Sequence, residues 1–370
     1  MRVPQSRPHI DDDDIDGVVK VLRSGNLSLG PKQAEFEKAI AAYVGTKHAV
    51  AVSSGTTGLH LCLIAAGVGP EDEVITSPYS FVASANSILY CGATPVFVDI
   101  EEDTLNMDPA LIEAAITPRT KAILAVHIFG HACDIDAINA IAKRHDLIVI
   151  EDACEALGAT IAGRKVGTHG NMAVFAFYPN KQMTTGEGGA IVTDDEKIHL
   201  LLQSLKNQGR SDDGNWLTHS RLGYNYRLTD IQCSLGITQL AKLDTMLQMR
   251  RKAADKYTAA LRNTPGITTP SARPDCAISW FVYVIRCEPT IDRNELLRHL
   301  MDHGIGAKPY LPSIHKQPYM QELLKPVPRL PISEKASSQT ISLPLFADIS
   351  AKEQSFVVQT LLEGIHAQRQ

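Results

Sequence analysis

Residues 147–159 read LIVIEDACEALGA, an apolar run from Leu147 to Ile150 that ends in two carboxylates, Glu151 and Asp152. A short apolar run bounded by polar residues is typical of a buried strand. Comparable runs occur at His48 to Val52, Glu73 to Thr76, Pro95 to Val98, Ala122 to Val126, Met172 to Phe177 and Gly189 to Thr193. Helical patterns such as Asp134 to His145 lie between several of them. This alternation predicts an α/β fold in which a mostly parallel sheet is covered by helices on both faces, giving three layers.

Composition and charge restrict the class of protein. The 370 residues are 44% hydrophobic and 21% charged, which is typical of a globular chain. With 36 basic and 41 acidic residues the net charge is −5, and no basic stripe offers the surface that neutralises nucleic-acid phosphates. We therefore expect a small-molecule partner and no nucleic acid. No window approaches the roughly 18 consecutive apolar residues of a membrane helix, and no signal-peptide pattern opens the chain, so a cytoplasmic protein with no membrane partner is expected.

Composition changes near residue 245 and divides the chain. Eleven of the 20 prolines lie in the last 125 residues, together with a strand-like run from Trp280 to Arg286 and a helical pattern from Asp292 to His303. We predict a large domain over residues 1–245 and a smaller C-terminal α+β domain over residues 246–370, bridged by a helix from Leu243 to Leu261. In the large domain, the acidic run at residues 11–14 precedes a helical stripe and is expected to be a solvated helix cap.

A small-residue turn follows the first predicted strand. Ser53, Ser54, Gly55, Thr56 and Thr57 lead into a helical pattern. Free backbone N–H groups and the helix dipole converge at such a junction and favour an anion such as a phosphate. An ordinary helix cap explains the same residues equally well. No GxxxxGK[ST] or GxSxG pattern occurs here, which argues against a P-loop and a nucleophile elbow.

Two reactive groups follow in the chain. Asp152 ends its strand where ligands bind in α/β sheets, and it could cap a helix, ligate a metal or pair with a protonated ring nitrogen. Lys181 lies 29 residues later in the stretch FAFYPNKQMTTGEGG at 175–189. Apolar strands and glycines around it would shield its amine from water and favour Schiff-base chemistry, whereas a surface lysine in a hairpin loop is the alternative. An amine, a carboxylate and an anion cradle are together what pyridoxal 5'-phosphate (PLP) requires.

Two further features leave alternatives open. Phe81 follows the strand Glu73 to Thr76 and could stack on a pyridine ring, although plain core packing is as good an explanation. His127, His131 and Cys133 suggest a metal-dependent enzyme, but the two histidines are separated by Gly130 instead of sharing one helix face. We therefore expect no metal. The seven cysteines contain no CxxC pair, so neither a disulfide framework nor a zinc ribbon is predicted.

Taken in order, these motifs resemble the DegT/StrS family of sugar-nucleotide aminotransferases, which have the aspartate aminotransferase type of fold. The resemblance runs from about Pro4 to the end of the chain. It is carried by SGTTGLHL at 54–61, IEDACEALGA at 150–159, FAFYPNKQMTTGEGG at 175–189, GYNYRLTDIQCSLG at 223–236 and the run Tyr310, Pro312, His315, Gln317.

The resemblance implies a role for each matching residue. Lys181 would bond to the PLP aldehyde, Asp152 would pair with the pyridine nitrogen and Phe81 would stack on the ring. Gly55 and Thr56 would hold the phosphate. The family completes its phosphate site with an asparagine of the partner subunit, which matches Asn225 and implies a homodimer with a shared active site. His315 falls in a loop that approaches the sugar in relatives, the alternative being a solvent-facing loop histidine.

Two positions depart from the family pattern. Relatives usually carry a serine five residues before the lysine, where Ala176 stands here, so one hydroxyl contact to the phosphate would be lost. Glu155 occupies a position near the phenolic oxygen of the cofactor that is often Gln or His, and its pKa should be raised there. Related 3-dehydratases carry histidine in place of the lysine, so Lys181 favours transamination.

The resemblance also suggests a substrate. It implies transfer of an amino group from L-glutamate to a nucleotide-linked keto sugar, for surface polysaccharide or related amino-sugar biosynthesis. The TTGEGG continuation after the lysine resembles enzymes that aminate C4 of a 4-keto-6-deoxy sugar, whereas C3 enzymes more often continue with Asn-Leu-Gly. Two alternatives are a C3 aminotransferase and a PLP-binding regulatory protein without turnover.

Overall fold

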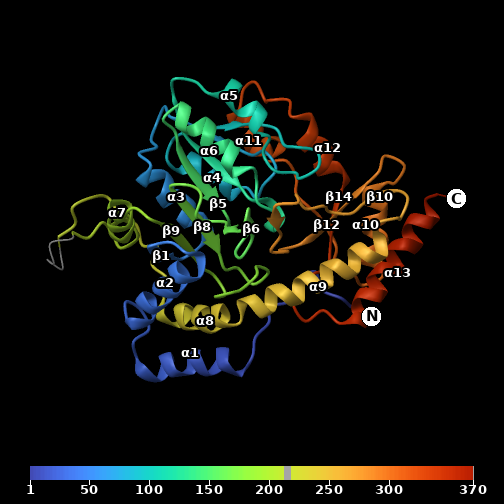
Figure 1. Cartoon of the computed structure of the whole chain (residues 1–370), viewed down its shortest axis with the longest axis horizontal. Coiled ribbons are helices and arrows are strands. Elements are labelled where there is room, and N and C mark those ends of the chain that lie inside the picture. Colours follow the sequence, from blue (N-terminus) through green and yellow to red (C-terminus); the bar gives the residue numbers. More distant parts are fainter. Residues whose placement is uncertain (212–217, 370) are drawn as a thin grey trace.

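The central element of the computed structural model, which describes residues 1–211 and 218–369, is a seven-stranded sheet with the order β1-β9-β8-β5-β4-β2-β3 (Figure 1). Its strands are β1 (His48–Val52), β2 (Glu73–Thr76), β3 (Thr94–Phe97), β4 (Thr120–Val126), β5 (Ile148–Asp152), β8 (Met172–Ala176) and β9 (Gly189–Thr193). The pairs β2–β3, β2–β4, β4–β5 and β5–β8 are parallel. Only β9 runs opposite to its neighbours β8 and β1. The prediction of a mostly parallel sheet is confirmed.

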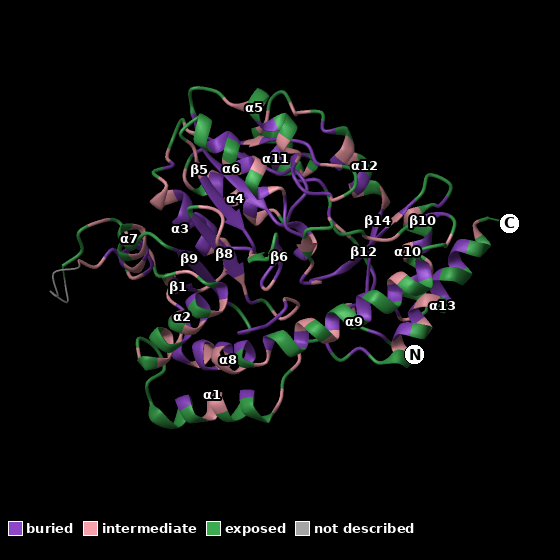
Figure 2. Cartoon of the chain, in the orientation of Figure 1, coloured by how far each residue is buried: buried purple, intermediate pink, exposed green. Residues whose placement is uncertain are grey.

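Helices cover both faces of this sheet, and alternate strand residues divide between them. On β8, Ala173 and Phe175 belong to the core that includes α2, α6 and α8, whereas Met172 and Val174 belong to the core that includes α3, α4 and α7. Figure 2 shows the strands of this sheet as largely buried, whereas the helices around it carry both buried and exposed residues. The helices of this domain are α1 (Asp12–Ser24), α2 (Pro31–Val44), α3 (Gly55–Ala65), α4 (Ala83–Tyr90), α5 (Ile112–Ala115), α6 (Ile135–Arg144), α7 (Glu196–Lys206) and α8 (Asp230–Ala241), with 3₁₀ turns η1 (Pro109–Leu111) and η2 (Ile128–Gly130).

The predicted acidic cap of α1 is only partly a solvated one. Asp11 caps the helix, accepting a hydrogen bond from the amide of Asp14. Asp14 itself is buried against α8, where its carboxylate lies 2.5 Å from Lys242 Nζ and accepts from Thr238 and Gln239. The acidic run therefore also anchors α1 to α8 and to Lys242, the residue that follows it.

A second core forms around a smaller sheet with the order β10-β12-β14-β13. Its strands are β10 (Ile267–Thr268), β12 (Tyr283–Cys287), β13 (Lys308–Pro309) and β14 (Thr340–Leu343), and a three-stranded sheet outside it contains β6 (Thr160–Ile161), β7 (Arg164–Lys165) and β11 (Cys276–Ala277). The helices of this half are α9 (Leu243–Leu261), α10 (Arg293–Asp302), α11 (Pro318–Leu323), α12 (Pro331–Gln339) and α13 (Ala351–Ala367), with the 3₁₀ turn η3 (Ile314–Lys316). Helix α9 has the predicted bounds and runs from α8 to α13 (Figure 1).

Two segments lie on the other side of the predicted boundary between residues 245 and 246. Val3 is buried in the second core and pairs with Ile305, so the first residues belong with the smaller half. Conversely, Ile314 and Met320 pack with Phe97 at the edge of the large sheet. The predicted strand from Trp280 also begins later, because Trp280 has a φ of +34° and cannot continue a strand. Among the described residues no helix is long and apolar enough to cross a membrane.

Candidate active site

Three strands of the large sheet, β1, β8 and β5, end at one edge, and each leads to or carries one of the predicted groups. Strand β1 leads into Gly55, β5 ends at Asp152, and β8 leads into the loop that contains Lys181. The strand order places β9 and β8 between β1 and β5. Val52, Gly189 and Ala176 lie opposite one another across β1, β9 and β8. The topology therefore brings the cradle, the carboxylate and the amine together.

The cradle is the N-terminus of α3. Ser54 caps the helix by accepting from the amide of Thr57, and the Thr57 hydroxyl accepts from the amide of Ser54 in return. Since this capping box uses the third helical amide, Gly55 and Thr56 carry the first two, which have no carbonyl partner within a helix. A Cβ at Gly55 would lie 2.8 Å from both Ala176 Cβ and Cys154 Sγ, so only glycine fits. This helix end therefore has the hydrogen bonds of an ordinary cap and also two amides that could bind an anion, so both explanations of the sequence remain compatible with it.

The carboxylate of Asp152 is buried and oriented by two donors. Ser84 Oγ donates to Oδ2 at 2.7 Å, and the amide of Cys154 donates to Oδ1 at 3.3 Å. Ser84 in turn lies 2.7 Å from Ser80 Oγ. Burial, together with the nearby Asp152, raises the pKa of the Cys154 thiol far above its ordinary value. The surroundings of Asp152 therefore keep Cys154 neutral and hold one carboxylate in a fixed direction.

The side chain of Lys181 is 14% exposed, so it is not the surface lysine of the alternative explanation. Its Nζ lies 3.5 Å from Glu155 Oε1 and 4.0 Å from the centre of the Phe281 ring. The adjacent Gln182 anchors the loop, because its Nε2 donates to the carbonyl of Glu155 at 2.5 Å and to Ser279 Oγ at 2.8 Å. The amine is thus presented between a carboxyl and an aromatic face.

Glu155 is buried beside this amine. Its Oε2 accepts from the amide of Phe129 at 3.0 Å. Burial raises the pKa of Glu155, and the opposing attraction of Lys181 does not cancel that effect. The direction is the one expected from the sequence. A carboxyl group in this position exchanges a proton more readily near neutral pH than an exposed one.

Phe81, Asn225 and His315 differ in their exposure. The ring of Phe81 is 61% exposed, so the core-packing explanation is wrong, and Asn225 is exposed on a segment that pairs with Asn207. His315 is fully buried, and its Nε2 lies 3.1 Å from Glu334 Oε1. The explanation of His315 as a solvent-facing loop residue is therefore wrong. Its contact with a substrate stays a prediction.

The histidines of the metal hypothesis have other partners. His127 is buried with Nε2 3.0 Å from Glu151 Oε2, and its Nδ1 accepts from the amide of Cys133. His131 Nε2 accepts from the amide of Arg273. Within residues 1–211 and 218–369, no cluster of three or more metal-ligating side chains occurs. The pair of histidines packs the sheet edge instead.

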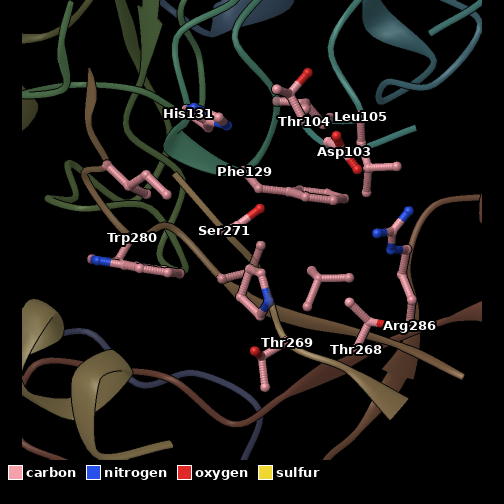
Figure 3. Close-up of a pocket in the computed structure, with 15 residues that line it drawn as sticks. Asp103, Thr104, Leu105, Phe129, His131, Thr268, Thr269, Ser271, Trp280 and Arg286 are labelled. Atoms are coloured by element: carbon pink, nitrogen blue, oxygen red, sulfur yellow. The ribbon is translucent and has the colours of Figure 1, made fainter. Parts of the chain in front are cut away.

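Phe129, whose amide donates to Glu155, also lines a pocket (Figure 3). The ring of Phe129 projects into it, and Asp103, His131, Trp280 and Arg286 contribute polar or aromatic groups to its wall. Lys181 and Asp152 are not among its lining residues. The amine and the carboxylate therefore form a separate site, linked to this pocket through the hydrogen bond between Phe129 and Glu155.

Comparison with known proteins decides the family. The sequence profile of the DegT/DnrJ/EryC1/StrS aminotransferase family matches residues 8–362. The chain belongs to this family. It is 40% identical to the spore coat polysaccharide biosynthesis protein SpsC of Bacillus subtilis over 373 aligned residues, covering 97% of this chain and 96% of that protein. It is 38% identical to the GDP-perosamine synthase of Caulobacter vibrioides, covering 97% of each.

Solved structures of relatives agree with this assignment. DesV of S. venezuelae, solved in complex with a ketimine intermediate, is 36% identical with a TM-score of 0.92 over 98% of each chain. Spr1654 of Streptococcus pneumoniae, solved in its PLP-form, is 30% identical with a TM-score of 0.94 over the whole of each chain. This chain is therefore an aminotransferase, and it has the fold of the PLP-dependent DegT/DnrJ/EryC1/StrS family.

The residues at the sheet edge fit PLP. The cradle at Gly55 has no room for a side chain, as expected where a ligand must approach the backbone closely. Asp152 is held as an oriented acceptor, and Lys181 supplies a shielded amine. They are the kinds of group that PLP requires, namely a site for an anion, an acceptor for a protonated ring nitrogen and a nucleophilic amine.

Sequence reasoning missed three residues of this site: Ser84, Phe281 and Arg250. Ser84 and Phe281 carry no signal that separates them from ordinary helix and strand residues. Arg250 does, because it occupies the apolar stripe of α9 formed by Met246, Ala253 and Tyr257. A charged residue on the buried face of an amphipathic helix indicates a specific partner.

Proposed function

We propose that this enzyme transfers the amino group of L-glutamate to the ketone of a nucleotide-linked sugar, with a 4-keto-6-deoxy sugar as the acceptor. The observation that carries the proposal is the meeting of Gly55, Asp152 and Lys181 at one edge of the sheet. The names of the relatives support the sugar, since one is a GDP-perosamine synthase and another acts in spore coat polysaccharide biosynthesis. Amination at C4 is supported by the TTGEGG pattern at 184–189.

When bound, PLP supplies a carbonyl that reacts with amines and a ring that accepts electrons. Gly55 and Thr56 would bind its phosphate, and Asp152 would hold a proton on its ring nitrogen. Lys181 Nζ would take the proton from the α-carbon of glutamate in the first half of the reaction. In the second half, the same amine would deliver a proton to the sugar carbon that receives nitrogen. Glutamate leaves as 2-oxoglutarate and the ketone becomes an amine, so the two halves balance.

The neighbours of Lys181 support this proton transfer. Glu155 lies 3.5 Å from Nζ and its pKa is raised by burial. In its neutral form it would not tie the amine into an ion pair, and in its charged form it would stabilise the ammonium. Ser84 keeps Asp152 pointing in one direction during both halves of the reaction.

We further propose that the active enzyme is a homodimer in which Asn225 of one subunit completes the phosphate site of the other. Asn225 is exposed, as a residue that reaches a second subunit must be in the single chain. Phe81 is exposed beside β2, where its ring would be free to lie over the cofactor.

The test is a half-reaction followed by absorption. The purified protein should show the visible band of bound PLP, L-glutamate should bleach it, and one of the GDP-, UDP- or dTDP-linked 4-keto-6-deoxy sugars should restore it. In the Lys181→Ala variant, glutamate should bleach no band and no keto sugar should restore one. The control Lys197→Ala, which changes an exposed lysine, should behave as wild type. A coloured protein that ignores glutamate would instead favour regulation without turnover, and restoration only by 3-keto sugars would favour C3. A colourless protein would overturn the proposal.

A further inference from the structure

Arg250 is a charged side chain enclosed where the two halves of the molecule meet. It lies on α9, the helix that connects them (Figure 1), and is 3% exposed. A buried charge ordinarily pairs with an opposite charge. The guanidinium of Arg250 donates instead to four backbone carbonyls. Burial lowers the pKa of this guanidinium to about 10, which still leaves it charged at neutral pH.

The carbonyls belong to three segments that are distant in the sequence. Nη2 donates to the carbonyl of Lys181 at 3.0 Å, and Nη1 lies 3.4 Å from the carbonyl of Trp280, 3.3 Å from that of Phe281 and 3.4 Å from that of Leu345. Thus one guanidinium contacts the loop of the amine, the segment just before β12 and the segment that follows β14.

Two of these contacts control the surroundings of the same atom. Lys181 carries the amine, and the Phe281 ring lies 4.0 Å from its Nζ. Arg250 holds the main chain at both residues, so it fixes the amine relative to its aromatic neighbour. The contact with Trp280 supports a backbone that has a positive φ of 34°, a conformation that needs help from its surroundings.

We propose that Arg250 is a positioning residue for the amino transfer, which sets the main chain of Lys181 and of Phe281 and so places the Lys181 amine. This inference rests on the proposed role of Lys181. Reactive groups must be held within roughly 0.5 Å of their working geometry. The loop from Phe177 to Gly188 contains no helix or strand, so side-chain anchors of this kind must supply that accuracy.

The experiment compares Arg250→Met with Arg251→Met, because Arg251 is the exposed neighbour on the same helix. The first readout needs no cofactor: the apoprotein is treated with trace acetic anhydride, and acetylation of Lys181 is measured by mass spectrometry relative to exposed Lys252. The second readout is the rate at which glutamate bleaches the PLP band, resolved into the limiting rate and the glutamate concentration for half-maximal rate.

In Arg250→Met we expect acetic anhydride to acetylate Lys181 at a rate different from that in wild type. The limiting rate of bleaching by glutamate should fall by about 100-fold, as it does when a catalytic group is displaced. The glutamate concentration for half-maximal rate should change little. Arg251→Met should match wild type in both. Arg250→Lys, which keeps the charge without the planar fork, should fall between them. Wild-type values for Arg250→Met would overturn the proposal.

Two outcomes keep the inference separable from the proposed function and from folding. If Arg250→Met does not fold by circular dichroism, Arg250→Lys decides, and wild-type acetylation and rate in that variant would overturn the proposal. If wild type and Arg251→Met show no reaction with glutamate, the proposed function fails. The acetylation of Lys181 then still decides whether Arg250 positions it.

Discussion

Replacing Gly55 with alanine should weaken the binding of PLP through its phosphate and through no other part of the cofactor. The new Cβ would lie 2.8 Å from Ala176 Cβ and 2.8 Å from Cys154 Sγ. Non-bonded carbon atoms prefer about 3.5–4.0 Å, so the first turn of α3 must move away by several tenths of an ångström or more. The amides of Gly55 and Thr56 move with it.

The magnitude follows from the contacts that are disturbed. Overpacking of this kind costs about 1–3 kcal/mol of folding stability, partly offset by the better helix propensity of alanine, up to about 1 kcal/mol. The larger effect is on the ligand. A hydrogen bond to a charged group contributes about 1.5–3 kcal/mol, so misaligning one amide should raise the Kd for PLP by roughly 10- to 150-fold.

The assay titrates the apoprotein with PLP and, separately, with pyridoxal, which lacks the phosphate. Gly55→Ala should lose affinity for PLP and keep its affinity for pyridoxal. Gly69→Ala is the matched control, because a Cβ at Gly69 meets nothing within 4 Å. Adding Ala176→Gly to Gly55→Ala removes one of the two clashing atoms and should recover part of the affinity, which a double-mutant cycle measures. Equal losses for PLP and pyridoxal, or none for PLP, would refute the assignment of the cradle.

Three other changes test the remaining groups. Asp152→Asn should slow the half-reaction with glutamate roughly 100-fold or more, since an amide cannot balance a positive ring nitrogen, and an N-methylated PLP that is permanently charged should recover part of the rate. Because burial raises the pKa of Glu155, its neutral form adds stability at acid pH that is lost as pH rises through the raised pKa. The apoprotein Tm of Glu155→Gln should therefore rise relative to wild type as pH increases above about 4. Mixing the inactive variants Lys181→Ala and Asn225→Ala should regenerate activity only if subunits share a site, and persistent inactivity of the refolded mixture would contradict the shared dimer.

The elements of the large domain could be predicted from the sequence because their patterns are local. Buried strands are short apolar runs, and β1, β2 and β9 have the predicted bounds. Helix ends also carry local signals: α2 begins at Pro31 and is followed by Gly45, whose φ of +97° suits glycine. Ligands bind at the carboxyl edge of a parallel sheet. Once the strands were predicted, Asp152 at the end of one and Gly55 just after another could therefore be chosen as candidate site residues.

The remaining features depend on contacts between distant segments, which local patterns do not encode. Val3 pairs with Ile305, and Asp14 is buried beside Lys242. Val3 and Asp14 both lie in polar stretches of sequence that would be expected to be exposed. The burial of His315 arises because η3 packs against the edge strand β3 near Phe97. Arg250 was detectable only as a charge in an apolar stripe, and its partners are carbonyls that any residue could provide.

The reversed strand β9 explains why the lysine and the cradle stay in register. After β8 the chain passes through the Lys181 loop and returns antiparallel between β8 and β1. The return brings Gly189 opposite Ala176 on one side and Val52 on the other, and a Cβ there would lie 2.8 Å from the carbonyl carbon and oxygen of Ser54. A larger residue at 189 would push the helix cap away from the loop. Strand β9 therefore both ends the Lys181 loop and fixes the position of the N-terminus of α3. A shift of the Lys181 loop along the sheet would move the amides of Gly55 and Thr56 with it.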